Sequence, residues 1–198
     1  MGGTSLSNSA EAKLAVHLYH SLDRETGGAS SKSRVAIISP YSQQVSLLRR
    51  LFSQALGDEF SKRVEINTVD GFQGREANIV IFSCVRAAGS KGVGFLSDVR
   101  RMNVALTRAK HFLFVIARCQ SIISNPYWRD LVNHAMETEA VVRVPRMGGA
   151  GHVFPDLKCL KSLPPPPKKI IPINKSKDID AQITAGDDGS SDEDGEIS

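Results

Sequence analysis

The sequence predicts an α/β domain built on a parallel β-sheet with helices on both faces. Three apolar runs are continuous rather than alternating, as in strands buried on both faces: Val35–Ile38, Ile79–Val85 and His111–Ala117. Segments with apolar residues at helical spacing lie between these runs. This alternation of strands and helices is typical of a parallel sheet covered on both sides.

The remaining elements follow from spacing and from turn residues. We expect helices over residues 10–22, 45–56, 98–109 and 126–139, and a further strand over residues 64–69. Asn8 or Ser9 could cap the first helix, and Gly57 could end the second.

The composition divides the chain into a folded part and a tail. After Pro145 the chain is rich in glycine and proline and ends in an acidic run, so it has few apolar residues to bury. We therefore expect one folded domain over residues 1–146 and a disordered tail over residues 147–198.

The net charge of +4 is unevenly distributed. Residues 1–146 carry 19 Lys and Arg against 12 Asp and Glu, and residues 147–198 carry 6 against 9. A basic domain suits a polyanion such as nucleic acid, although many basic domains bind no charged partner. No stretch approaches the roughly 20 consecutive apolar residues of a membrane span, and we expect no membrane partner.

The loop over residues 70–76 directly follows a predicted strand. Ligands bind beyond the carboxyl ends of the strands in open parallel sheets. Two glycines, Gly71 and Gly74, let the backbone turn tightly and approach a phosphate or a sugar. Hydrogen-bonding side chains stand beside them at Gln73, Arg75 and Glu76. The alternative is a polar turn without a ligand.

The predicted helix over residues 98–109 combines a buried stripe with two arginines. Its apolar residues at helical spacing are Met102, Ala105, Leu106 and Ala109. Arg101 and Arg108 are seven positions apart and would project from nearly the same line of the helix. Two such guanidinium groups suit a phosphate recognised across an interface, and the alternative is two solvated arginines on an outer face.

Three strings together resemble helicase motifs IV, V and VI. They are Ile37–Tyr41, Asn67–Glu76 and Arg100–Lys110, in that order and at the family's spacing. They are similar to the superfamily-1 branch that contains senataxin and the nonsense-mediated-decay helicase, and the senataxin type is the most similar. The segment Ser5–Ala12 resembles the stretch that precedes motif IV in this branch. The resemblance covers roughly residues 1–135 and implies a RecA-like fold of the P-loop NTPase type, the second of two motor domains.

The resemblance implies roles for the residues around the nucleotide. Arg108 matches the arginine finger that stabilises the γ-phosphate during hydrolysis, and Arg101 would support the site or the interface. Gly74 and Glu76 match positions that line the nucleotide pocket, with Glu76 near the ribose. Gln73 matches a position in the region that couples this pocket to the nucleic acid, and we include it among the nucleotide-binding candidates.

The resemblance also implies a nucleic-acid track and partners. The turn Ser39-Pro40-Tyr41 and Thr68 match positions on the nucleic-acid side of the sheet, where backbone contacts tolerate many side chains. The implied cofactors are ATP and Mg²⁺, and the implied partners are single-stranded RNA or DNA and the first RecA-like domain of the same helicase. RNA or RNA–DNA hybrids are the implied substrate. We expect an intracellular protein, nuclear rather than cytoplasmic.

The chain departs from the family's two-domain pattern. A GxxxxGK[ST] loop fails at Lys32-Ser33 because Ser31 replaces the glycine, and Asp58-Glu59 follows a helix end instead of a strand. We therefore expect the Mg²⁺ ligands on the other motor domain, no metal site here, and no ATP hydrolysis by this chain alone. The alternative function is a truncated, non-catalytic module that binds nucleic acid or a partner.

Overall fold

The structure, a computed structural model, describes residues 6–25, 34–85 and 94–144. The tail expected over residues 147–198 lies outside these ranges, and so does most of the glycine-rich connection at residues 89–94. The boundary expected at residue 146 therefore stays a prediction.

In the part of the chain that the structure describes, four parallel strands form a sheet in the order β2-β1-β3-β4. The strands are β1 (Val35–Ser39), β2 (Val64–Thr68), β3 (Ala77–Ser83) and β4 (Ala109–Ile116). All five residues of β1 are buried, as its continuous apolar run predicts. The predicted parallel sheet is confirmed.

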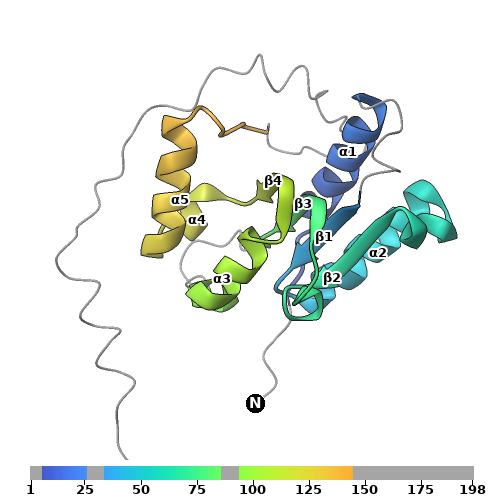
Figure 1. Ribbon diagram of the computed structural model, residues 1–198, viewed down its shortest axis with the longest axis horizontal. Helices are drawn as coiled ribbons and strands as arrows, with labels where there is room; N and C mark the ends of the chain where they lie inside the picture. The colour runs from blue at the N-terminus through green and yellow to red at the C-terminus, as the bar shows by residue number, and fades with distance from the viewer. Residues whose placement is uncertain (1–5, 26–33, 86–93, 145–198) are drawn as a thin grey trace, which may run out of the picture. The chain divides into compact units, whose positions relative to one another are not determined.

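Helices cover both faces of the sheet (Figure 1). One face carries α1 (Ser9–Glu25) and α2 (Ser42–Leu56), and the other carries α3 (Val99–Leu106), α4 (Cys119–Ile122) and α5 (Pro126–Glu137). Successive residues of a strand point to opposite faces. Ile37 accordingly belongs to the core under α1 and α2, while Ile38 belongs to the core that contains Trp128 of α5. The predicted α/β fold is confirmed.

Local hydrogen bonds set the ends of the first two helices. Asn8 caps α1, because its Oδ1 accepts the N–H groups of Ala10 at 3.1 Å and Glu11 at 3.2 Å. Gly57 ends α2 with φ 81°, and its N–H donates to the Ser53 carbonyl at 2.9 Å. Both expectations are confirmed, with Asn8 rather than Ser9 as the cap.

Helix α3 ends at Leu106, three residues before the predicted end at residue 109. The Thr107 hydroxyl donates to the Asn103 carbonyl at 2.7 Å, and the Arg108 Nε donates to the Val104 carbonyl at 2.9 Å. The next residue, Ala109, already pairs with β3. The prediction that Arg101 and Arg108 share one line of a helix was therefore wrong, because only Arg101 is helical.

Strand β3 is shifted by two residues from its predicted range, 79–85. It begins at Ala77 and ends at Ser83. Val85 has a φ of 69°, which no strand residue adopts, and its N–H donates to the Glu11 carboxylate instead of a neighbouring strand.

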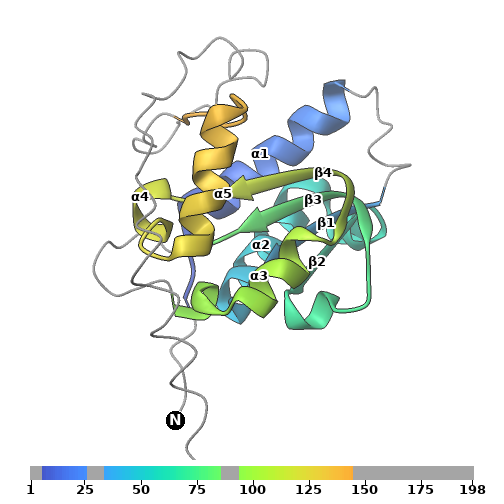
Figure 2. The same cartoon turned by 60° about the vertical axis from the view of Figure 1, so that its left-hand side comes forward.

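Strand β4 is less buried than its apolar sequence predicts. Phe112 is 61% exposed, and Val115 is also exposed. Among the described residues, β4 pairs only with β3 and lies at one edge of the sheet (Figure 2). Composition cannot separate an edge strand from a central one, because both are apolar here.

Candidate functional site

The connecting loop, residues 69–76, runs from the carboxyl end of β2 to the amino end of β3. It contains the short 3-10 helix η3 (Asp70–Phe72), whose Phe72 is buried in the core on the α3 side of the sheet. The loop joins β2 to β3, which lie on either side of β1 in the sheet. It does so with a short 3-10 helix in place of an α-helix. The first residues of the loop therefore lie at the carboxyl ends of the strands, and its last residues lie at the amino ends.

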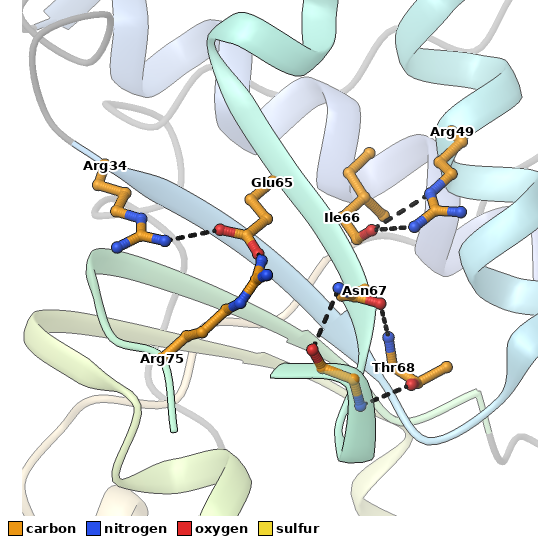
Figure 3. Close-up of polar contacts among 8 residues, drawn as sticks. Arg34, Arg49, Glu65, Ile66, Asn67, Thr68 and Arg75 are labelled. Atoms are coloured by element: carbon orange, nitrogen blue, oxygen red, sulfur yellow. Dashed lines mark hydrogen bonds and ion pairs between the residues drawn. The ribbon is translucent and has the colours of Figure 1, made fainter. Parts of the chain in front are cut away.

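The start of the connecting loop is tied to the end of β2. The Thr68 hydroxyl accepts the Gly71 N–H at 3.0 Å, and the Asn67 side-chain amide donates to the Gly71 carbonyl at 3.3 Å (Figure 3). A Cβ atom at position 71 would lie 2.6 Å from the Asn67 Oδ1. Gly71 is thus required for close packing within this turn.

The end of the connecting loop is exposed and charged. Gly74 has a φ of 76°, and a Cβ there would meet no atom within 4 Å. Glu65 of β2 contacts both Arg75 and Arg34, the latter at 3.0 Å (Figure 3). Glu76 pairs with Lys110 of β4 at 3.1 Å. Because Gly74 has no side chain and open space around it, a ligand could reach its backbone directly, beside the charged side chains of the loop end.

Arg108 lies between α3 and β4, against the end of the connecting loop. Its guanidinium donates to the carbonyls of Val104 at 2.9 Å and Arg75 at 3.4 Å, and to the Thr107 hydroxyl at 3.1 Å. Its own carbonyl accepts the Ala77 N–H at 3.0 Å. These guanidinium contacts are all with neutral oxygen atoms, so the positive charge of Arg108 is not compensated by them.

Arg101 lies at the other end of the loop. Its Nε is 3.4 Å from the Asp70 carboxylate and 3.9 Å from that of Asp98. Helix α3 has eight residues and is therefore about 12 Å long. Arg101 and Arg108 thus contact the two ends of the loop. Gln73 is exposed between these ends.

The residues expected on the nucleic-acid side gather at the carboxyl ends of β1 and β2. Ser39 pairs with Thr68, and the Val69 N–H donates to the Ser39 carbonyl at 3.2 Å. The side chains of Ser39 and Tyr41 are buried, whereas Pro40 and Thr68 are partly exposed. A ligand at this edge would meet Pro40, Thr68 and the backbone.

Sequence reasoning missed a buried polar cluster, which consists of Asn8, Glu11, Gln44 and Ser83. The Glu11 Oε2 accepts the Ser83 hydroxyl at 2.7 Å and the Val85 N–H at 2.8 Å. Burial raises the pKa of Glu11 from 4.5 to about 7, although these hydrogen bonds oppose the shift. The Asn8-to-Glu11 spacing matches a helix-capping pair, but that pattern does not reveal burial.

Neither a metal cluster nor a membrane-spanning helix occurs in the described ranges. No group of three or more His, Cys, Asp or Glu side chains there could hold a metal ion. None of the described helices combines the length and the apolar character needed to cross a membrane.

Comparison with known proteins gives consistent matches. Residues 1–120 match the family described as AAA domain. A probable helicase of Dictyostelium discoideum is 43% identical over 145 residues, which cover 72% of this chain and 14% of that protein. The helicase SEN1 of Saccharomyces cerevisiae is 41% identical over 67% of this chain and 6% of its own length. The probable helicase senataxin of Mus musculus is 32% identical over 69% of this chain and 5% of its own length. The chain therefore spans a small part of these relatives.

Proposed function

The chain belongs to the superfamily-1 helicases of the senataxin branch, and from this premise we propose that it is the second motor domain of an ATP-dependent helicase. In this proposal it completes an ATPase site held mainly by a first RecA-like domain. It also supplies part of the track for single-stranded RNA or DNA, with RNA or RNA–DNA hybrids as the preferred substrate.

The observation that carries the proposal is the placement of Arg108. Its guanidinium lies at the exposed end of the connecting loop, and the hydrogen bonds that it makes within the described residues all go to neutral oxygen atoms. A positive charge held in this way can stabilise the charge that develops on a transferring phosphoryl group. Arg101 is paired with Asp70 at the opposite end, which favours a supporting role for it.

The residues at the end of the connecting loop fit one side of a nucleotide. Arg108 would contact the γ-phosphate, the bare backbone at Gly74 would allow close approach, and Glu76 could accept hydrogen bonds from ribose hydroxyls. Gln73 would lie beside them. ATP bound with Mg²⁺ supplies the phosphoryl group that is transferred to water, and the Mg²⁺ ligands would come from the other domain.

The nucleic acid would lie at the carboxyl edge of the sheet, near Pro40 and Thr68. Backbone groups and helix termini commonly hold the sugar-phosphate chain without reading its sequence. The side chains of Ser39 and Tyr41 are buried and would support the backbone of this edge without contacting the nucleic acid. Such a helicase would act inside the cell, and we propose the nucleus.

A second candidate is a non-catalytic module that binds nucleic acid or a partner protein. The sequence feature that favours it is the failure of the GxxxxGK[ST] pattern at Ser31. A module of this kind would keep the edge near Pro40 and Thr68 but would not support ATP hydrolysis with any first motor domain.

The ATPase rate of a two-domain enzyme tests the proposal. The chain is joined to the first motor domain of a relative, and phosphate release is measured with and without single-stranded RNA. We expect Arg108→Ala to lower kcat by about 10³-fold, the scale of other arginine fingers. Arg50→Ala, which removes an exposed arginine of α2, is the control and should not change kcat. An Arg108→Ala enzyme with the wild-type kcat would contradict the proposed role.

A further inference from the structure

The buried polar cluster lies at the topological switch point of the sheet. From β1 the chain passes through α2 to β2 on one side, whereas β3 connects through α3 to β4 on the other side. Open α/β sheets bind ligands beyond the carboxyl ends of the strands at this point. Here the chain's own Asn8 and Glu11 reach the carboxyl end of β3.

Glu11 is the centre of the cluster and is only 6% exposed. Its Oε2 accepts hydrogen bonds from the Ser83 hydroxyl and the Val85 N–H, and its Oε1 accepts one from the Asn8 side chain at 3.1 Å. A buried carboxyl group with this number of donors has a fixed position, since each lost bond would leave a polar atom unsatisfied.

Hydrogen bonds from the cluster hold Val85 in a backbone conformation that is unfavourable for valine. Its φ of 69° is in the left-handed region, which β-branched residues strongly disfavour. The Val85 N–H is bound to Glu11, and its carbonyl accepts the Asn8 Nδ2 at 3.3 Å. The direction in which the chain leaves β3 is therefore set by Asn8 and Glu11.

The same cluster anchors the first turn of α2, which begins just after the turn at Pro40. Gln44 is fully buried in the first turn of α2, three residues after Tyr41. Its amide donates to the Ser83 hydroxyl at 3.0 Å and to the Asn8 carbonyl at 3.2 Å, and its Oε1 accepts the Asn8 N–H at 2.7 Å. One set of hydrogen bonds thus joins the two backbone segments that diverge at the switch point.

We propose that Glu11 is a positioning residue for nucleic-acid binding: it holds the backbone at Val85 and, through Ser83 and Gln44, the turn at Pro40, so that together they form the surface that receives a single strand. This inference rests on the proposed function, because it assumes that this edge binds nucleic acid. Glu11 itself is buried and does not touch the ligand.

Two variants of similar size separate the hydrogen bonds of Glu11 from its charge. Glu11→Gln keeps an oxygen that can accept the Val85 N–H and the Ser83 hydroxyl and loses only the bond from the Asn8 side chain, whereas Glu11→Met fills the space with an apolar side chain that replaces none of these bonds. Both remove the same carboxyl group. We expect Glu11→Gln to bind single-stranded RNA as the wild type does, and Glu11→Met to bind about tenfold more weakly, as for the loss of one or two hydrogen bonds.

The measurement is fluorescence anisotropy of a short labelled oligouridylate with the full chain, at a temperature where circular dichroism shows each variant folded. Glu59→Met is the charge control, because it removes an exposed carboxylate. Removing a negative charge favours RNA binding, so charge cannot explain a weaker affinity in Glu11→Met. Hydrogen exchange of the Val85 amide should be fast in Glu11→Met and slow in Glu11→Gln.

The outcomes distinguish this inference from the function on which it rests. No RNA binding by the wild-type chain would overturn the proposed nucleic-acid edge and the inference together. Wild-type affinity in a folded Glu11→Met chain would overturn the inference alone. If Glu11→Met does not fold, Ser83→Ala replaces it, since it removes the hydroxyl that links Glu11 to Gln44. Unchanged affinity in Ser83→Ala would then overturn the inference.

Discussion

The buried carboxyl group of Glu11 should make the stability of the domain fall as the pH rises. Burial raises its pKa from 4.5 to about 7 in the fold, so between these values the folded chain holds a proton that the unfolded chain has lost. The free energy of unfolding therefore decreases from about pH 4.5 to about pH 7 and is constant above that range. At about 1.4 kcal/mol per pKa unit, the decrease due to Glu11 is about 3 kcal/mol.

Glu11→Gln removes this ionisation and should remove this part of the pH dependence. Urea denaturation at pH 5, 6, 7 and 8 gives the free energy of unfolding of both chains, provided that each unfolds in two states. We expect the variant to gain about 3 kcal/mol relative to the wild type across this range. Glu59→Gln controls for the loss of an exposed carboxylate. A difference between wild type and Glu11→Gln that is the same at every pH would refute the reasoning.

Three other predictions concern the site and the tail. The chain alone should release phosphate from ATP no faster than buffer in a malachite-green assay with single-stranded RNA, and turnover that survives repurification would contradict this. A chain ending at Arg146 should keep the thermal midpoint of the full chain, because the residues removed have little to bury; a loss of more than a few degrees would show that they pack on the domain. Gly74→Ala should lower the free energy of unfolding by about 1 kcal/mol, because φ is 76° there, and equal urea midpoints would argue against a strained backbone.

The apolar patterns of the sequence were sufficient to predict the sheet. The run at residues 35–38 is buried on both faces because β1 is central, and this environment leaves no polar position in the pattern. The end of α3 was not predictable in the same way. Ala109 continues the helical spacing of Met102 and Ala105, although α3 has ended at Leu106 and Ala109 is the first residue of β4. Periodicity cannot show that a neighbouring strand takes over the hydrogen bonds of Ala109.

The candidate site was predicted only in part because its members are brought together by long-range contacts. The motif strings assigned Arg108 and residues of the connecting loop to one nucleotide site, and Arg108 contacts this loop through the Arg75 carbonyl. They did not reveal that Arg101 contacts the opposite end, since that depends on where α3 lies on the sheet. Nor did they reveal the buried hydrogen bonds of Glu11, whose partner Ser83 is 72 residues away in the sequence.

The connecting loop is only just long enough to join the carboxyl end of β2 to the amino end of β3. It must cross two strand spacings and about six residues of strand height, a distance of about 22 Å. Its eight residues could span about 26 Å if one short 3-10 turn is included. A second turn, in which the Arg75 N–H donates to the Phe72 carbonyl at 3.1 Å, takes up much of the remaining slack. Little slack therefore remains between Asp70 and Arg75, and α3 contacts both ends of the loop through Arg101 and through a residue just beyond the end of the helix, Arg108.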